Sequence, residues 1–476
     1  MTHNTPHTFH PSILRAYDIR GTFTATLFVE DAILLGQKIA SYLRTHKTPE
    51  PLTVGLVRDG RISSPLLHNA LKETLLELGI HIIDFGVGPS PMGYFAHATH
   101  TLDGLIVVTA SHNPKEDNGF KILLKGKNLC GEELLTFASL PTDLPPAHER
   151  GSLTYHDIKE AYVRFCADSV TKESLPPLKI AWDFSHGAMA VMADLMRHHI
   201  PGQHFYACDT VDGHFPIHDP DPTNRSNLKS IQNLIRTHQC DLGFIFDGDG
   251  DRLVVLDHTG EPIDGDRLVV FLAHDVLRTH PKATILSDIK ASITFQEGIT
   301  HLGGTPLLSR TGHSFIKTKI KQTGALLAGE MSGHIFFADE SYGYDDGLYA
   351  ACRFLRLLGR FDRTAKEFED RLPRYAITPE YKLKLPAYEN PFFKFDIITS
   401  LQHYLRTHSI PFLDEDGIRL EQEKGWWLLR ASNTENCLIL RLEGRDHTAL
   451  EGIKDHYKKC IERGFPSGAP FLINVL

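Results

Sequence analysis

Short apolar runs alternate along the chain with longer stretches that are apolar on one side only. Val54–Val57 precedes a turn and the helical pattern of Leu66–Leu78, and His81–Phe85 and Leu105–Val108 are further strand-like runs. Strands that alternate with amphipathic helices are typical of α/β domains. The first part of the chain is therefore predicted to form an α/β domain with a mostly parallel or mixed sheet.

The same alternation returns twice more and then changes. Leu178–Trp182 and Leu242–Phe246 predict strands of a second unit, and Ala283–Leu286 predicts a strand of a third. Beyond residue 372, strand-like runs cluster between Gly417 and Glu443, with helical patterns before and after them. We therefore predict three sequential α/β mixed-sheet domains and a smaller C-terminal α+β domain around a central cleft. The expected boundaries are 1–152, 153–256, 257–372 and 373–476.

Composition narrows the class of protein. A chain of 476 residues is too long for one core, and a net charge of -9 argues against a nucleic-acid partner. No run of about 20 apolar residues occurs, so we expect no membrane partner. Seven cysteines without CxxC spacing favour a reduced, cytoplasmic setting.

A cluster of carboxylates follows the apolar run that ends at Phe246. Asp247, Asp249 and Asp251 alternate with two glycines, which allow a sharp turn, so that the three side chains can converge. Oxygen ligands of this kind suit Mg²⁺. Because a later Glu ligand is missing, the segment does not match an EF-hand loop. The sequence therefore predicts a magnesium site, with a solvated acidic turn as the alternative.

A serine stands at the end of another strand. Ser111 lies in Thr109–Pro114, where its hydroxyl can project from a tight loop, and Lys121 follows ten residues later. An unactivated serine is a weak nucleophile, so it needs a base or a phosphoryl group held in line by a cation. Lys121 can supply charge, or accept a proton if its pKa is depressed. An ordinary turn is the alternative.

Two later loops favour binding. Glu330 and Ser332 alternate in Gly329–His334 and suit a pair of sugar hydroxyls. Arg430–Asn436 offers a guanidinium fork for a phosphate and several neutral donors. A charged bulge and a polar hairpin turn are the respective alternatives. Little can be inferred from four further residues taken singly, namely Tyr17, Arg20, Lys290 and His313. We interpret Arg58–Arg61 as a structural ion pair.

Taken together and in order, these loops resemble those of the α-D-phosphohexomutase family. The resemblance extends from Arg15 to about Glu443, and Glu330–His334 and Arg430–Thr434 are most similar to the bacterial phosphomannomutase/phosphoglucomutase branch. Two positions depart from the family pattern. Asn436 stands where many members have proline, and Phe184–Gly187 replaces the usual Gly-Asn-Gly turn, a change that we expect to be structural.

The resemblance implies a role for each loop. Phosphorylated Ser111 would hold Mg²⁺ together with Asp247, Asp249 and Asp251. The implied catalytic residues are Ser111, Lys121, Arg20, His313 and Arg252, with Lys121 or His313 as the acid/base group. The implied substrate contacts are Glu330 and Ser332 for sugar hydroxyls, Arg430, Ser432, Asn433 and Thr434 for phosphate, and Tyr17, Lys290 and His334.

The function implied is interconversion of hexose 1-phosphate and hexose 6-phosphate, of mannose, glucose or both. A phosphoserine would donate to the sugar, and hexose 1,6-bisphosphate would be both intermediate and activator. A phosphosugar is the expected partner of a monomeric protein, with a dimer as the alternative. A Mg²⁺-dependent phosphatase and a non-catalytic phosphosugar-binding protein remain as alternative functions.

Overall fold

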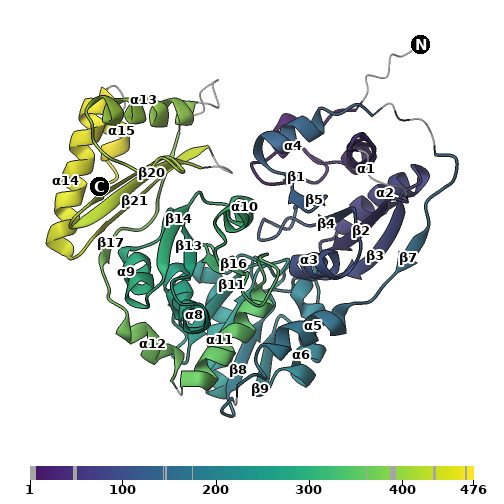
Figure 1. Cartoon of the computed structure of the whole chain (residues 1–476), viewed down its shortest axis with the longest axis horizontal. Coiled ribbons are helices and arrows are strands. Elements are labelled where there is room, and N and C mark those ends of the chain that lie inside the picture. Colours follow the sequence, from purple (N-terminus) through teal and green to yellow (C-terminus); the bar gives the residue numbers. More distant parts are fainter. Residues whose placement is uncertain are drawn as a thin grey trace.

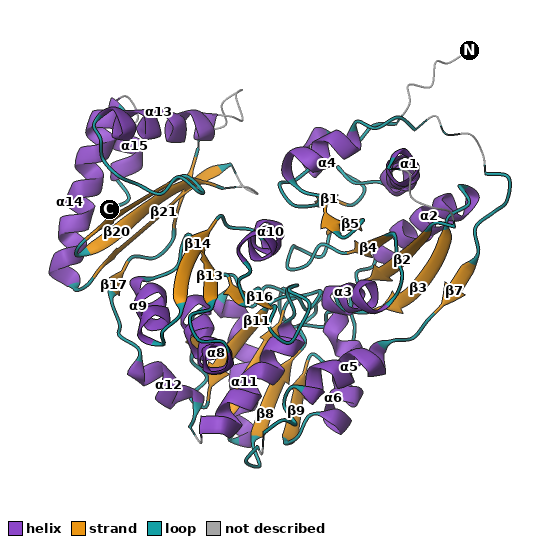
Figure 2. Cartoon of the chain, in the orientation of Figure 1, coloured by secondary structure: helices purple, strands orange, loops and turns teal. Residues whose placement is uncertain are grey.

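Four sheets follow one another along the chain and give the molecule a heart-like outline (Figure 1). The first and last domains form two lobes above the second and third. The computed structural model describes residues 7–46, 51–142, 144, 147–173, 175–361, 363–385, 393–432, 436–466 and 469–476. The predicted fold class is confirmed, since three mixed α/β sheets precede an antiparallel sheet with helices (Figure 2).

The first sheet is mixed. Its strands, in spatial order, are β1 (Ile19–Thr22), β5 (Asp117–Leu124), β4 (Gly104–Val108), β2 (Thr53–Arg58), β3 (His81–Val87) and β7 (Leu153–Tyr155), with β6 (Lys127–Asn128) paired to β5. The pairs β2–β4, β2–β3 and β3–β7 are parallel, and β5 is antiparallel to β1 and β4. The helices are α1 (Val29–Thr45), α2 (Ser64–Glu77), α3 (Ser90–Thr99) and α4 (Gly131–Ala138).

Both faces of this sheet are covered, which explains its continuous apolar runs. Leu56 and Ile106 belong to one buried cluster, whereas Val57 and Val107, one residue on in each strand, belong to another. The strand period of two sends neighbouring residues to opposite faces.

The second and third sheets repeat the plan. The second contains β12 (Pro262–Ile263), β11 (Leu253–Asp257), β10 (Leu242–Phe246), β8 (Lys179–Asp183) and β9 (Gln203–Ala207), with α5 (Lys159–Asp168), α6 (Ala193–His199) and α7 (Lys229–His238). The third contains β14 (Thr305–Ser309), β13 (Thr284–Asp288), β15 (Leu327–Gly329) and β16 (Ile335–Phe337), with α8 (Gly265–Thr279), α9 (Ile293–His301), α10 (His313–Thr323), α11 (Gly347–Phe361) and α12 (Ala365–Arg371).

The fourth sheet is antiparallel throughout its described pairs. It contains β17 (Ala376–Ile377), β21 (Cys437–Gly444), β20 (Gly425–Ala431) and β19 (Ile418–Gln422), with β18 (Tyr381–Lys384) also paired to β21, and the helices α13 (Phe393–Thr407), α14 (His447–Gly464) and α15 (Ala469–Ile473). Single 3₁₀ turns occur at Pro11–Ile13, Ala188–Met192 and Arg225–Leu228.

Two sheets extend past the expected domain boundaries. β7 lies beyond residue 152 yet pairs with β3, and β12 lies beyond residue 256 yet pairs with β11. Both are short edge strands whose pairing is tertiary, so the local pattern does not reveal them. The boundaries themselves stay predictions.

The hydrophobic cores show how firmly the domains are joined. One buried cluster runs through the first three, with Phe95, Trp182 and Phe354 among its members. The fourth domain has its own core and meets the third through a small cluster that includes Ile289 and Trp426. The fourth domain is therefore the least tightly attached. Among the described residues, no helix combines the length and apolar character that a membrane span requires.

Candidate active site

Ser111 lies where β4 ends, in a left-handed backbone conformation with φ of 51°. Such a conformation is uncommon for a residue other than glycine and costs about 1 kcal/mol or more, so the surroundings must hold it. Thr109 Oγ1 accepts from the Ser111 N–H at 2.9 Å. The Ser111 hydroxyl donates to Asp247 Oδ2 at 2.6 Å and lies 3.1 Å from His112 Nδ1. The strand end thus presents the hydroxyl to the second domain.

Arg61 supports the backbone of the loop that carries Ser111. One of its terminal nitrogens donates to the Ser111 and Asn113 carbonyls, both at 2.7 Å, and the other donates to Pro114 at 2.6 Å and Asp117 at 3.0 Å. The guanidinium is buried and ion-paired with Asp59. The structural ion pair expected at Arg58–Arg61 is present, but four carbonyl contacts make Arg61 a support of the Ser111 loop.

The three aspartates that follow β10 converge, as their alternation with glycine predicts. Asp247, Asp249 and Asp251 are fully buried, and one oxygen of each lies within 4.8 Å of the others. Among the described residues, Asp249 Oδ1 and Asp251 Oδ1 have no hydrogen-bond partner. Burial, Asp251 and Asp249 raise the pKa of Asp247 well above 3.8. Buried carboxylate oxygens with free lone pairs fit a hard divalent cation.

Lys121, on β5, enters this carboxylate cluster. Its ammonium group donates to Asp249 Oδ2 at 2.5 Å and to Asp251 Oδ2. Burial lowers the pKa of Lys121, but the two carboxylates outweigh it and raise that pKa well above its usual value. These surroundings favour a charged Lys121 over a neutral base.

A chain of polar contacts runs from the aspartates into the third domain. Arg252 Nε donates to His334 Nε2 at 3.0 Å, and His334 Nδ1 lies 3.0 Å from Asp345. His313, at the start of α10, stacks on His334 and lies 3.5 Å from the same Asp345 carboxylate. Burial, followed by Lys317, lowers the pKa of His313 well below 6.5. A neutral His313 can accept a proton.

Glu330 and Ser332, in the loop Gly329–His334, line the same cavity as Ser111. Glu330 Oε1 accepts from the Gly312 N–H at 2.6 Å, whereas its buried Oε2 has no partner among the described residues. Burial raises the pKa of this carboxyl. Arg20 donates to Asn113 at 2.9 Å and to Asp18 at 2.5 Å, next to the serine loop.

Arg430, at the end of β20, brings a cation from the fourth domain. Its Nε donates to Asp416 at 2.8 Å, while Nη2 is buried without a partner among the described residues. Asp416 fixes the guanidinium and leaves donors for a bidentate anion. The predicted contacts Asn433 and Thr434 lie outside the described residues.

One cavity of about 510 Å³ joins these groups. The predicted site residues that line it are Tyr17, Arg20, Ser111, Lys121, Asp251, Arg252, Lys290, His313, Glu330, Ser332, His334, Arg430 and Ser432. Asp247 and Asp249 lie just beneath, tied to it through Ser111 and Lys121. Arrangement alone does not assign roles, so those roles stay predictions.

Sequence reasoning missed several residues of the site. The contacts of Arg61 beyond its expected ion pair, and the contact of Asp416 with Arg430, join groups that are separated in sequence, and no local signal marks them. Asp345 belongs to the segment Gly-Tyr-Asp-Asp-Gly, whose two adjacent acids between glycines could have indicated a site residue. Ser90, which donates to Asp249, opens α3 and resembles an ordinary helix start.

Comparison with known proteins identifies the family. The models for phosphoglucomutase/phosphomannomutase α/β/α domains I, II and III match residues 11–134, 160–260 and 264–375, and the C-terminal domain model matches 389–458. A phosphomannomutase/phosphoglucomutase of Pseudomonas aeruginosa is 36% identical over 464 residues, 96% of this chain and 98% of its own.

Two further relatives agree. A phosphoglucomutase of Neisseria gonorrhoeae is 36% identical over 455 residues, 94% of this chain and 96% of its own. The crystal structure of a family protein from Burkholderia thailandensis superimposes with a TM-score of 0.88 at 33% identity, covering 97% of this chain and 99% of that one. The fold and cleft are thus those of a mutase. The chain belongs to the phosphoglucomutase/phosphomannomutase family.

Proposed function

We propose that this protein interconverts hexose 1-phosphate and hexose 6-phosphate, of mannose, glucose or both, through phosphorylated Ser111. The observation that carries the proposal is the hydrogen bond between Ser111 and Asp247, which places the nucleophile beside three buried carboxylates. One relative is named phosphomannomutase/phosphoglucomutase and another phosphoglucomutase, and both names support a hexose phosphate substrate.

Phosphoryl transfer depends on positioning and on neutralising charge on the phosphoryl oxygens. Asp247, Asp249, Asp251 and an oxygen of phosphorylated Ser111 would hold Mg²⁺, which would neutralise part of that charge. Arg20, Arg252 and Lys121 line or border the cavity and supply fixed positive charge. Arg61 supports the Ser111 loop by hydrogen bonds to three of its carbonyls and to the Asp117 carbonyl at the start of β5.

The reaction exchanges one O–P bond for another. A free hydroxyl of the sugar phosphate forms a bond to the phosphorus of phosphoserine, the bond to Ser111 Oγ breaks, and hexose 1,6-bisphosphate results. The hydroxyl proton goes to a base, for which the neutral His313 is the candidate. Charged Lys121 has no lone pair to accept that proton, so its acid/base role would be to donate a proton to the departing Ser111 Oγ. After the bisphosphate turns end for end, its other phosphate returns to Ser111.

The reaction requires a phosphate-binding group remote from Ser111 and a sugar site that accepts both orientations. Arg430 and Ser432 would hold the phosphate remote from Ser111, with Asn433 and Thr434 as further expected donors. Glu330 and Ser332 would contact sugar hydroxyls, with Tyr17, Lys290 and His334 around them. We further propose that the fourth domain rotates to close the cleft against water, since its attachment is small.

A coupled assay tests this function. Glucose 1-phosphate and mannose 1-phosphate are supplied with Mg²⁺, with and without a trace of glucose 1,6-bisphosphate, and both 6-phosphate and free phosphate are measured. Formation of 6-phosphate without free phosphate, stimulated by the bisphosphate, supports the mutase. Free phosphate without isomerisation would indicate a phosphatase, and binding without turnover would indicate a phosphosugar-binding protein.

A further inference from the structure

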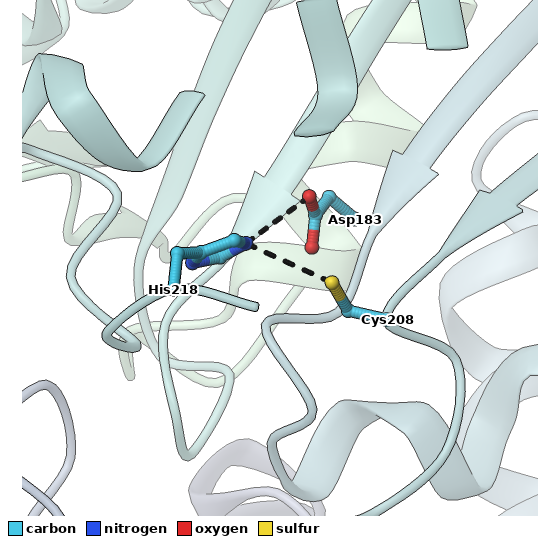
Figure 3. Close-up of side chains that lie close together, drawn as sticks. All are labelled: Asp183, Cys208 and His218. Atoms are coloured by element: carbon cyan, nitrogen blue, oxygen red, sulfur yellow. Dashed lines mark hydrogen bonds and ion pairs between the residues drawn. The ribbon is translucent and has the colours of Figure 1, made fainter. Parts of the chain in front are cut away.

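A second group of metal-ligand side chains lies in the second domain. Asp183 ends β8, and Cys208 directly follows β9, its parallel neighbour. His218 comes from the loop that continues from Cys208, and Figure 3 shows all three side chains pointing at one another. His218 Nε2 lies 3.3 Å from Asp183 Oδ2 and 3.8 Å from Cys208 Sγ. One oxygen, one sulfur and one nitrogen therefore lie within 4.8 Å of one another.

The geometry differs from that of a cysteine–histidine–aspartate triad. A triad histidine uses one ring nitrogen for the nucleophile and the other for the carboxylate. Here the same atom, Nε2, faces both Asp183 and Cys208, while Nδ1 lies 2.8 Å from the Asp219 carbonyl oxygen. The cluster is therefore not arranged to activate Cys208 as a nucleophile.

The same hydrogen bonds prepare the three groups for a metal ion. A carbonyl oxygen can only accept, so Nδ1 of His218 carries a proton. Nε2, which pairs with the Asp183 carboxylate in the absence of an ion, is the atom that would coordinate a metal. Asp183 Oδ1 accepts from the Ser185 N–H at 2.9 Å, which leaves Oδ2 facing Nε2. A lone pair and a carboxylate oxygen that face each other need a proton or a cation between them.

We propose that Asp183, Cys208 and His218 form a second metal site, which binds one divalent cation of the Zn²⁺ type. Mixed sulfur, nitrogen and oxygen donors suit zinc and cobalt, whereas the all-oxygen aspartate cluster suits Mg²⁺. A pocket of about 390 Å³ is lined by His218 and by Ser230, whose hydroxyl lies 3.9 Å from Cys208 Sγ, and water would reach the ion from this side. On binding, the thiol proton of Cys208 and the Nε2 proton through which His218 pairs with Asp183 both pass to solvent.

The ion would anchor the segment between Cys208 and Asp221, which reaches the active-site cavity. Between Cys208 and His218, the buried ring of Phe215 lies under Arg61, whose carbon Cζ is 5.3 Å from the ring centroid. Beyond His218, Asp221 lines the active-site cavity. The metal therefore links β8 and β9 to the segment that supports Arg61, and its expected role is structural.

Cobalt provides the test, because cysteine thiolate bound to Co²⁺ gives a charge-transfer absorption that carboxylates do not. The full chain is stripped with chelator, saturated with Mg²⁺ to fill the aspartate cluster, and titrated with Co²⁺. We expect the thiolate absorption to saturate at one equivalent and to be displaced by Zn²⁺. Cys208→Ser and His218→Gln are each expected to weaken Co²⁺ binding by tenfold or more.

Cys460→Ser is the matched control. Cys460 Sγ also lies 3.9 Å from a histidine, His456, but that pair is not part of a three-ligand cluster among the described residues. This variant is expected to keep the full absorption. The proposal would be overturned if the unmodified protein showed no thiolate absorption. It would also be overturned if Cys208→Ser kept the absorption or if Cys460→Ser lost it.

A second measurement needs no variant and so does not depend on folding of the mutants. Zn²⁺ is expected to slow alkylation of Cys208 by iodoacetamide while leaving the rate at Cys130 unchanged, as read by peptide mass mapping. Equal rates at Cys208 with and without Zn²⁺ would overturn the proposal. The phosphoryl-transfer mechanism stands independently of this second site.

Discussion

Ser111 Oγ donates a 2.6 Å hydrogen bond to Asp247 Oδ2 across 136 positions of sequence. The bond joins the end of β4 in the first sheet to the end of β10 in the second. Because both strands present their carboxyl ends to the same cavity, a hydroxyl and a carboxylate cluster meet at the junction of two domains. The chemistry we propose depends on that junction.

Asp247→Asn is expected to change stability in opposite directions with and without Mg²⁺. Burial and two neighbouring carboxylates raise the pKa of Asp247, so its charge is unfavourable unless a cation is bound. In EDTA the variant should melt about 1 °C above the unmodified protein, the shift expected for roughly 1 kcal/mol in a chain of this size. In Mg²⁺ the order should reverse.

Thermal melts in the two buffers measure this effect. Asp241→Asn serves as the control, because Asp241 precedes the same strand but lies outside the carboxylate cluster. The same melting order in both buffers would show that Asp247 does not bind the ion.

Arg61→Lys is expected to lower kcat by roughly 10- to 100-fold, because several hydrogen bonds of about 1 kcal/mol each to the Ser111 loop are lost. The positive charge is kept, so KM should change little. Steady-state kinetics with glucose 1-phosphate measure both constants. Arg58→Lys is the control, since Arg58 contacts the Asp59 carbonyl at 3.2 Å. Equal effects of the two variants would remove the special role of Arg61.

Arg430→Lys is expected to raise KM roughly 10- to 100-fold with a smaller change in kcat, because a bidentate contact to phosphate is worth about 1.5–3 kcal/mol. Lysine presents one point charge where arginine presents a fork. Arg406→Lys, in an exposed pair with Asp414 of the same domain, should leave both constants unchanged. An unchanged KM for Arg430→Lys would place the distal phosphate elsewhere.

Asp346→Asn is expected to gain stability relative to the unmodified protein as pH rises. Burial raises the pKa of Asp346 from 3.8 to about 7. Between these values the folded state holds a proton that the unfolded state has released, so stability falls as pH rises through this window and levels off above it. Asparagine resembles the protonated acid and can still accept from the Tyr162 hydroxyl.

The difference in unfolding free energy should favour the variant by about 2 kcal/mol more at pH 8 than at pH 5. Melts at both pH values measure it. Asp345→Asn is the contrasting neighbour: the pKa of Asp345 lies below its usual range because Lys317 and His334 outweigh burial. That variant should be destabilised at both pH values. A pH-independent difference for Asp346→Asn would contradict the raised pKa.

The site residues that sequence alone could indicate are polar side chains that follow a predicted strand. Asp247 comes directly after an apolar run and Ser111 three positions after the end of one, so their place at a sheet edge was predictable from sequence. Their meeting was not, since it depends on how two domains pack; it came from the family resemblance. Asn433 and Thr434 stay predictions, because they lie outside the described residues.

Residues that act through tertiary contacts escaped prediction. Arg61 was interpreted as part of a structural ion pair, and its Asp59 contact is present, but its carbonyl partners lie 50 or more positions away. The Phe184–Gly187 turn was expected to be structural. In the structure Ser185 donates to the Phe246 carbonyl at 2.6 Å, and so supports the strand that precedes the aspartates.

Phosphorylation of one serine is the most direct test of the account. The purified chain is incubated with glucose 1,6-bisphosphate and Mg²⁺, and intact-mass measurement is followed by peptide mapping, with Ser111→Ala in parallel. We predict one added phosphoryl group, carried by Ser111, and neither that group nor mutase turnover in the variant. A phosphoryl group on another residue, or full turnover by Ser111→Ala, would contradict the mechanism.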